Sequence, residues 1–330
     1  MPLGSAKVGL FGAAGATAAG GQRGVFWASN TGSVTNVIQY ITINSAGDAT
    51  DFGDTTIKFA DRGCTSNGGD DRGVAGGGYD HSSSTTNVIE YITISSPGDA
   101  TNFGDLTYRA QYGRYAPATV SNGTNDRGVW MSPYYYDTID YVTISSTGDA
   151  TDFGDMTDEF HEAAAMSNGT DERGISFAGL KNTTGAETDV IEYITINSTG
   201  NSTDFGDALG AKGYMAGCSN DTSDRGIAAG GYKTADSPRR HNVIQYITIT
   251  STGNATDFGD LTTVLAQGSG LSNGTGERGI VGGGANDASG TKQDVIQYIT
   301  INSTGNAADF GDLLAAAKAG GTTGLSDAAA

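Results

Sequence analysis

The sequence contains few of the residues that most directly reveal a site or a compartment. Its two cysteines, Cys64 and Cys218, are too few for a disulfide framework. Only 18 lysines and arginines stand against 37 aspartates and glutamates, and the net charge is −19. This charge argues against nucleic acid or an anionic membrane as the partner. No apolar run approaches the roughly 20 residues that span a bilayer, so membrane insertion is not expected.

Recognisable catalytic motifs are also missing. The chain has no H-E-x-x-H sequence, and its three histidines, His81, His161 and His241, are far apart. We therefore expect no enzymatic activity and no cofactor. Calcium is the metal that the sequence leaves open, because it takes carboxylate oxygens and D-x-x-D pairs recur. These pairs are Asp51 with Asp54, Asp152 with Asp155 and Asp257 with Asp260. Their spacing does not match an EF-hand loop, so turn acids are the simpler interpretation and no metal site is predicted.

Glycine and an internal repeat are what the chain has in abundance. There are 52 glycines, and the segment NVIQYITINSAGDATDFGD at 36–54 recurs five more times with small changes. The tyrosines that mark the repeat are 50 to 53 residues apart: Tyr40, Tyr91, Tyr141, Tyr193, Tyr246 and Tyr298. A fixed period of this length indicates an array in which each unit buries its faces on its neighbours.

Each repeat divides into four short segments, which we call a, b, c and d. Segment a is a small-residue stretch before an SNG-type turn, and segment b begins at an arginine, as in RGVAGGGY from Arg72. Segment c is VIQYITI and segment d is ATDFGD. Segment c is apolar on both alternating faces, which predicts a strand covered on both sides. Glycine with Asn or Asp between a and b, and between c and d, predicts tight hairpins.

Four antiparallel strands repeated six times predict an all-β fold, a six-bladed β-propeller. A parallel β-helix is the main alternative, but it needs shorter coils of roughly 20–30 residues. A helical solenoid is excluded because no apolar period of 3.6 residues occurs. We expect an N-terminal arm at 1–12, the propeller at 13–313 and a C-terminal tail at 314–330. The N-terminus faintly resembles a signal peptide, but its second half aligns with the segment before each later repeat.

Two a-like segments, at about 14–21 and about 314–324, compete for the innermost position of the first blade. We expect the N-terminal segment to take it, which leaves the last dozen residues to contact another subunit. Cys64 and Cys218 are expected at equivalent positions of segment a in blades two and five, on opposite sides of the ring. A disulfide requires Cα atoms within about 7 Å, so both are predicted to be free thiols.

Segments b and c resemble the kelch repeat. Gly77, Gly78 and Tyr79 precede the N-V-I-x-Y segment that begins at Asn87, and Gly230, Gly231 and Tyr232 precede the copy that begins at Asn242. The aromatic residue that kelch repeats carry on their fourth strand is matched by Phe52, Phe103, Phe153, Phe205, Phe258 and Phe310.

The exact residues of the repeat resemble those of a narrower group of proteins. YITI-S-TGNATDFGDL with SNGTDRG, and the opening MPLGSAKVGLFGAAG, resemble kelch-like structural proteins of marine bacteriophages, especially phages of cyanobacteria. The likeness covers nearly the whole chain. It implies a virion component, located in the tail or on the capsid exterior, and leaves open which component it is.

One charged pair recurs in each repeat and is predicted to tie neighbouring strands or blades together. Its arginines begin segment b: Arg23, Arg72, Arg127, Arg173, Arg225 and Arg278. Its aspartates end D-F-G-D: Asp54, Asp105, Asp155, Asp207, Asp260 and Asp312. The alternative interpretation is a ring of arginines that binds an anion in the central channel.

The connections between segments differ in how much they vary. In a four-stranded blade the a–b and c–d turns share one face of the propeller, here called the constant face because these turns are nearly identical. The b–c and d–a connections share the other, the variable face. Loops on a rigid scaffold commonly carry binding residues, and tyrosine and arginine are enriched at interface hot spots.

We therefore predict that the variable face makes the principal contact with a partner. The predicted patch is Tyr108, Arg109, Tyr112, Arg114, Tyr115, Tyr134, Tyr135 and Tyr136. A second, weaker contact is predicted at Arg239, Arg240 and His241. The alternative is that several of these tyrosines cover the core between blades.

Together with the resemblance, these loops indicate a structural and binding module of a phage particle, present in multiple copies. It is expected in the tail or tail fibre, in contact with neighbouring virion proteins or a host surface glycan. A capsid decoration protein is the first alternative, and a glycan-cleaving enzyme is the less favoured one.

Overall fold

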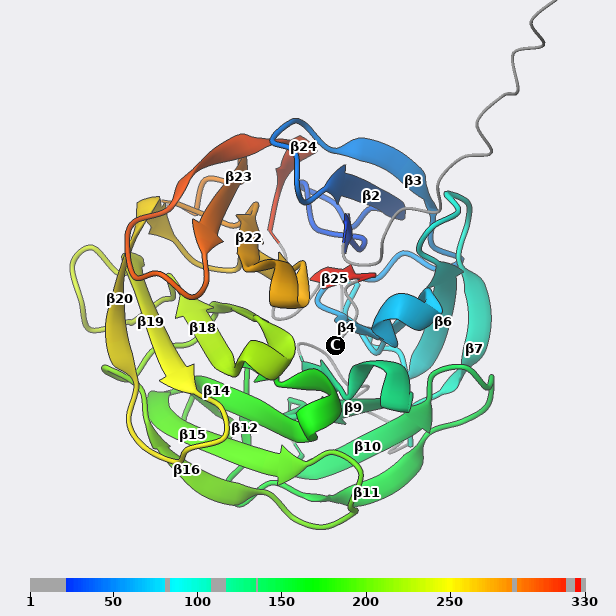
Figure 1. Cartoon of the computed structure of the whole chain (residues 1–330), viewed down its shortest axis with the longest axis horizontal. Helices are drawn as coiled ribbons and strands as arrows, with labels where there is room; N and C mark the ends of the chain where they lie inside the picture. Colours follow the sequence, from blue (N-terminus) through cyan, green and yellow to red (C-terminus); the bar gives the residue numbers. More distant parts are fainter. Residues whose placement is uncertain are drawn as a thin grey trace, which may run out of the picture.

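The computed structural model describes residues 22–80, 84–107, 117–134, 136–286, 290–318 and 324–327. These residues form a six-bladed β-propeller, in which six antiparallel sheets surround a central axis (Figure 1). The prediction of an all-β propeller with four antiparallel strands per blade is confirmed. This architecture is consistent with kelch-like repeats.

The first three blades follow the order a to d from the axis outward. Blade one consists of β25 (Gly324–Ser326), β1 (Arg23–Phe26), β2 (Val37–Thr42) and β3 (Thr50–Asp54). Blade two consists of β4 (Gly63–Ser66), β5 (Arg72–Gly76), β6 (Val88–Thr93) and β7 (Thr101–Asp105). Blade three consists of β8 (Ala118–Ser121), β9 (Arg127–Met131), β10 (Thr138–Thr143) and β11 (Thr151–Asp155).

The other three blades follow the same order with longer strands. Blade four consists of β13 (Ala164–Ser167), β14 (Arg173–Lys181), β15 (Glu187–Thr195) and β16 (Thr203–Asp207), and β12 (Phe160–His161) extends it beside β14. Blade five consists of β17 (Ala216–Ser219), β18 (Arg225–Ala229), β19 (His241–Thr248) and β20 (Thr256–Leu265). Blade six consists of β21 (Ser269–Ser272), β22 (Arg278–Gly282), β23 (Gln293–Thr300) and β24 (Ala308–Ala317).

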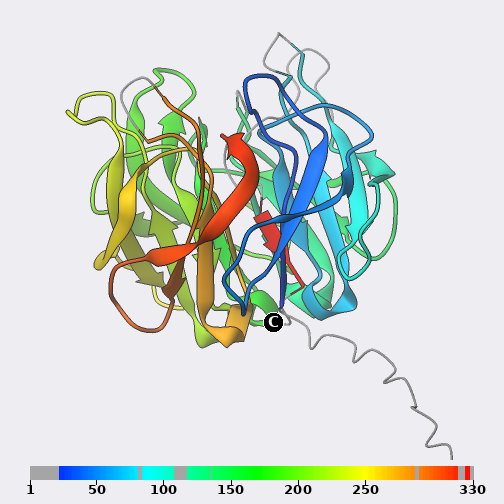
Figure 2. The same ribbon diagram turned by 90° about the horizontal axis from the view of Figure 1, so that it is seen from above.

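Five short 3₁₀ turns join strands a and b in blades two to six. They are η1 (Gly68–Asp70), η2 (Gly123–Asn125), η3 (Gly169–Asp171), η4 (Asp221–Ser223) and η5 (Gly274–Gly276). Figure 2 shows these turns at one end of the propeller and the longer loops at the other. The two faces expected from the sequence are therefore present, with the 3₁₀ turns on the constant face.

The core lies between blades, as the apolar character of segment c on both faces predicts. In β2, Ile38 is fully buried in a cluster shared with blade two, and Tyr40 packs against that cluster. Ile41 and Ile43 of the same segment belong to a cluster shared with blade six. Each third strand thus contributes to two interblade clusters, so removing one blade would expose the faces of two others.

The glycine of D-F-G-D allows the blades to approach closely. Gly259 has φ of +149°, and a Cβ there would lie 2.4 Å from the carbonyl oxygen of Gly305, in the c–d turn of the next blade. That turn donates backbone hydrogen bonds to the outer strand of the preceding blade, from Gly305 N to Phe258 O (2.9 Å) and from Ala307 N to Asp260 O (2.8 Å). The same contact closes the ring between blades six and one, where Gly47 N donates to Phe310 O at 2.8 Å. Each outer edge strand is thereby partly covered by its neighbour, which protects an edge that would otherwise be open to pairing.

The prediction of how the ring closes is wrong. The C-terminal strand β25 takes the innermost position of blade one and pairs antiparallel with β1, with Val25 opposite Leu325. Residues 314–317 belong to β24, and 324–327 complete the first blade, so the expected tail at 314–330 is in part propeller. The expected N-terminal strand at 14–21 and the arm at 1–12 lie outside the described residues.

The physical reason for this closure is a cap that the C-terminal segment reproduces. In blade five, Asn220 Oδ1 accepts the backbone N–H of Arg225 (2.6 Å) and its Nδ2 donates to the Glu277 carboxylate of blade six (3.0 Å). In blade one, Asp327 Oδ1 accepts the backbone N–H of Arg23 at 2.8 Å. The segment Gly324-Leu325-Ser326-Asp327 repeats Gly270-Leu271-Ser272-Asn273 of blade six with one change, Asp for Asn.

The two cysteines are free and buried, but they do not occupy equivalent positions. Cys64 pairs with Ala75, whereas Cys218 lies opposite Ile227, one residue further along strand a. The expected equivalence is therefore wrong by one residue, which turns the two side chains to opposite faces of their strands. Burial raises the pKa of each thiol to about 12.

Candidate functional site

The six arginines that begin strand b connect each blade to the next, but their partners are not the predicted ones. Arg225 Nη1 donates to the backbone carbonyl of Ile301 in blade six at 3.1 Å. Its guanidinium lies 4.5 Å from the ring centroid of Tyr246, which meets Phe258 edge-on at 6.2 Å. All six blades repeat this arrangement, with hydrogen bonds of 2.6 to 3.2 Å and cation–ring distances of 4.3 to 4.8 Å. A cation–π contact and a charge-assisted hydrogen bond thus replace an ion pair.

The predicted pairing of these arginines with the D-F-G-D aspartates is wrong. Among the residues that the structure describes, no arginine of this set forms an ion pair with Asp54, Asp105, Asp155, Asp207, Asp260 or Asp312. The reason is position: the arginine begins the second strand at the constant face, whereas the aspartate lies on the outermost strand, beyond strand c. The backbone N–H of Asp260 instead donates to Asn306 Oδ1 in the next blade at 3.0 Å.

The recurrent acid pairs do not gather into a metal centre. Asp51 and Asp54 are both exposed on the outer strand of blade one. Across the described ranges, no group of three or more His, Cys, Asp or Glu side chains is placed to hold a metal ion.

Most of the predicted tyrosine and arginine patch falls outside the described residues. This applies to Tyr108, Arg109, Tyr112, Arg114, Tyr115 and Tyr135. Tyr134 and Tyr136 are described and half-buried, and Tyr134 packs edge-on against His161 of blade four, with ring centroids 4.3 Å apart. One tyrosine of the predicted patch therefore contacts the next blade, as the alternative interpretation expects.

His161 forms a buried corner at the variable face. It is 5% exposed, and its Nδ1 lies 2.6 Å from Asn182 Oδ1, in the b–c loop of the same blade. Burial lowers the pKa of His161 to about 4, so the ring is neutral near pH 7. A neutral, buried histidine held by an amide is a structural element of this loop.

The inner corners of the d–a connections form a ring of residues with positive φ. Asp61, Glu162, Tyr214 and Gln267 have φ between 53° and 62°, and none is glycine. Backbone hydrogen bonds join successive corners, from Tyr214 N to Glu162 O and from Gln267 N to Tyr214 O, each 2.9 Å. Burial, reinforced by the charge of Asp61, raises the pKa of Glu162 well above its usual range. Because these residues carry no glycine signal, sequence reasoning missed the ring.

The second predicted contact, in the b–c loop of blade five, is fully described. Arg239 is exposed and its Nη1 donates to the hydroxyl of Tyr232 at 3.3 Å. Arg240 is 9% exposed, with its guanidinium 5.5 Å from the ring centroid of Tyr232. His241 Nε2 lies 3.2 Å from Asp236 Oδ2. The structure therefore places Arg239 and Arg240 against Tyr232, whereas His241 contacts Asp236.

The lysines have a distribution that the sequence reading overlooked. Every lysine in the described part of the chain lies in a b–c or d–a connection or at its edge, that is, on the variable face. These are Lys58, Lys181, Lys212, Lys233, Lys292 and Lys318. The signal was available: no lysine occurs in the a–b or c–d turns of any repeat. The variable face therefore differs from the constant face in charge as well as in sequence.

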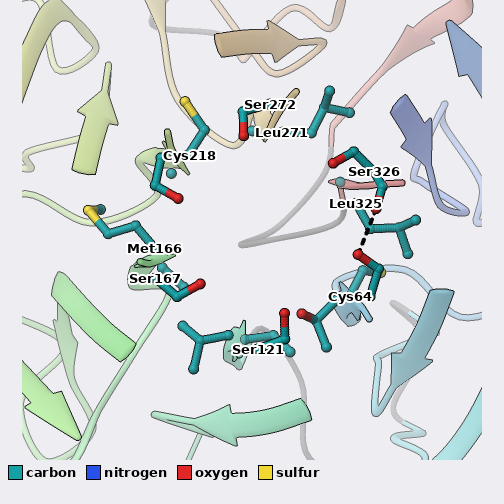
Figure 3. Close-up of a pocket in the computed structure, with 18 of the residues that line it drawn as sticks. Cys64, Ser121, Met166, Ser167, Cys218, Leu271, Ser272, Leu325 and Ser326 are labelled. Atoms are coloured by element: carbon teal, nitrogen blue, oxygen red, sulfur yellow. Dashed lines mark hydrogen bonds between the residues drawn. The ribbon is translucent and has the colours of Figure 1, made fainter. Parts of the chain in front are cut away.

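A cavity of about 110 Å³ lies along the axis between the innermost strands. Figure 3 shows serine side chains from several blades around it. Six serines, one from the last position of each inner strand, line it: Ser66, Ser121, Ser167, Ser219, Ser272 and Ser326. Asp221 is the only carboxylate among its lining residues, and burial raises the pKa of Asp221 to about 7. The channel therefore presents hydroxyls, and none of the six arginines of the alternative interpretation is among the described residues that line it.

Comparison of the sequence with protein-family models and with curated proteins finds no match. No helix in the described ranges is long and apolar enough to cross a membrane.

Proposed function

We propose that this chain is a structural and binding module of a phage particle, whose constant face and ring supply rigidity and whose variable face contacts a partner. The observation that carries the binding role is the asymmetry of the two faces. On the constant face, the same arginine–carbonyl contact recurs in all six blades and the same 3₁₀ turn recurs in blades two to six. On the variable face, loop length, aromatic content and charge differ from blade to blade.

This asymmetry supports binding because a fold that needed all its loops for stability would repeat them. In blade four the strands β14 and β15 extend into the b–c hairpin as far as Lys181 and Glu187, whereas in blade two β5 ends at Gly76 and β6 begins at Val88. Loops that vary on a fixed frame are a common location of recognition residues. The phage assignment rests on the resemblance of the repeat wording, and the location in tail or fibre is part of the same proposal.

Two measurements test the proposal separately. Quantitative mass spectrometry of purified phage particles, made by cells that encode the chain, should find it as a virion component. A copy number of a few tens or fewer favours the tail or fibre, and hundreds of copies favour capsid decoration. Absence from the particles would refute the virion assignment.

The binding role is tested on the purified chain. Replacing Thr183–Ala186 of blade four and Thr234–Pro238 of blade five by glycine–serine linkers of equal length should leave the folded ring intact. Binding to partner virion proteins or to host envelopes should fall by about tenfold or more, since hot-spot residues carry most of an interface's affinity. The control is a glycine–serine replacement of Ser45–Gly47 in the constant c–d turn of blade one. Equal loss from both replacements would show that the variable face has no special role.

A further inference from the structure

The two faces of the propeller use positive charge in different ways. The six strand-b arginines are each held by a tyrosine ring and a backbone carbonyl, so their charge serves the scaffold. The described lysines are all on the variable face, together with Arg239 and Arg240. On a chain with net charge −19, such cations mark the surface on which an anionic partner meets the least repulsion.

Blade five holds the densest group of these cations, here called the blade-five patch: Lys212, Lys233, Arg239, Arg240 and His241. Its frame is rigid, because the loop that carries four of the five is closed by a hydrogen bond from Lys233 N to Arg239 O at 2.8 Å. The loop is also tied to blade four, where Glu187 Oε1 accepts the N–H and the hydroxyl of Thr234, each at 2.7 Å. Tyr232 contacts both guanidinium groups: its hydroxyl accepts a hydrogen bond from Arg239, and its ring lies against Arg240.

Two carboxylates, Asp236 and Glu187, lie beside the patch. Asp236 lies 3.9 Å from Lys233 Nζ and 3.2 Å from His241 Nε2, while Glu187 is occupied by Thr234. Lys212 is 8% exposed, and its pKa is lowered by burial and by the neighbouring charge of Lys233, against the raising effect of Asp236. The pKa of His241 is lowered by burial and by Lys212 and Lys233, again against Asp236. The fold thus holds like charges together, and the exposed guanidinium of Arg239 donates its hydrogen bond to the Tyr232 hydroxyl rather than to a carboxylate.

We propose that the blade-five patch binds the carboxylate of an acidic glycan, which rests on the proposed role of the variable face as the binding surface. A planar guanidinium forms two parallel hydrogen bonds with a carboxylate, and Arg239 presents an exposed one. A glycan fits better than an acidic protein because the patch is confined to one b–c loop and the adjacent Lys212. Protein interfaces of ordinary size cover roughly 800 Å² on each partner.

The test compares two probes that differ only in charge. A galacturonic acid oligomer carries one carboxylate per sugar, and its fully methyl-esterified form has the same backbone without charge. We expect calorimetric binding of the acid form at low salt, weakening steeply as salt is raised, and binding of the ester at least tenfold weaker. The double variant Lys233→Ala/Arg239→Ala should lower affinity for the acid form about tenfold or more. The matched control, Lys58→Ala/Lys181→Ala, removes the same charge from the same face and should change affinity by less than about twofold.

Three outcomes overturn the proposal. Equal binding of both oligomers would show that charge is not recognised. An equal loss of affinity in the control variant would show that the overall positive charge of the face, and not a local site, attracts the oligomer. Tighter binding of a polyglutamate peptide of equal charge would indicate a protein partner.

The proposed function is separable from this inference. If neither oligomer binds, yet the loop-replaced chain still loses attachment to its partner, the glycan assignment fails and the binding face stands. If the oligomer binds at the blade-five patch but the loop-replaced chain attaches to its partner normally, the binding face fails instead.

Discussion

The constant and variable faces are built on the same strands but follow different rules. At the constant face, one set of contacts is repeated six times, and most of its positions keep one residue type from copy to copy. At the variable face, the four described d–a corners are Asp, Glu, Tyr and Gln, although all four share the same backbone conformation. The comparison teaches that the backbone of this propeller is periodic on both faces, whereas the side chains are periodic on only one. Side chains on the variable face can therefore diverge without altering the ring.

The largest loss of stability is expected where neighbouring blades approach each other closely. Replacing Gly259 by Ala should destabilise the fold by about 3 kcal/mol or more, because its Cβ would meet the Gly305 carbonyl and φ is positive. The matched control is Gly253→Ala, where φ is +157° but no atom lies within 4 Å of the new Cβ. That change should cost only about 1 kcal/mol. Chemical denaturation of both variants measures the difference, and equal losses would mean that interblade contact is not what the glycine serves.

His161 is an exception to the difference between the two faces, because it lies on the variable face but serves the scaffold. Its pKa falls from the usual 6.5 to about 4 on folding, so the neutral ring is favoured in the native state. The resulting stability is fully present above about pH 6.5 and is lost as pH falls towards 4. Between pH 7 and 4.5 the wild type should lose about 2 kcal/mol more than His161→Gln. Parallel denaturation curves at the two pH values test this, and an identical loss in both proteins would contradict it.

Asp221 tests the uniformity of the constant face. Four equivalent positions hold glycine with φ of 55° to 57°, whereas Asp221 adopts φ of 49° and faces the channel. Its pKa rises from 3.8 to about 7, so the charged form opposes folding above that pH and the penalty disappears as pH falls towards 3.8. Asp221→Gly should therefore stabilise the fold by about 1–2 kcal/mol at pH 8 and by much less at pH 4. Thermal denaturation at both pH values is the measurement, and a variant less stable than wild type at pH 8 would refute the account.

The smallest effect is expected at the seam of the ring. Asp327→Asn restores the residue that caps blades two to six, so stability should change by less than about 0.5 kcal/mol. Asp327→Ala removes the acceptor for the Arg23 N–H and should cost about 1 kcal/mol. The denaturation midpoints of the two variants are the measurement. Equal midpoints would show that the Asp327 contact is incidental and not a cap.

The fold followed from the sequence because its determinants are local and repeated. The two-sided apolar pattern of VIQYITI and the hairpin glycines recur in every copy, so the prediction of strands and hairpins does not depend on any single copy. The arginine was correctly predicted to tie blades together, but its partner is a backbone carbonyl, and every residue has one, so no side-chain pattern can reveal it. The closing strand was missed for a different reason: Asp327 replaces the Asn of the other copies, and Gly324-Leu325-Ser326 is a short match.

The candidate site was less predictable because its residues come from different repeats. Tyr134 and His161 are 27 residues apart in blades three and four, and only the ring brings their side chains into contact. Lys212 and Lys233 precede and follow the inner hairpin of blade five, and neither belongs to the repeated wording. Clusters formed between non-repeated residues leave no periodic signal.

The seam between β1 and β25 also determines how the ring bears mechanical load. Arg23 and Asp327 are hydrogen-bonded neighbours at the constant face, and the two strands run antiparallel from that point over three residue pairs. A force that pulls residues 23 and 327 apart therefore breaks these hydrogen bonds one after another, which is the weakest direction for a sheet. A force applied across the variable face is instead spread over many interblade contacts at once. Such a ring resists load on the loops of its variable face, whereas its first blade can be opened strand by strand from the constant face.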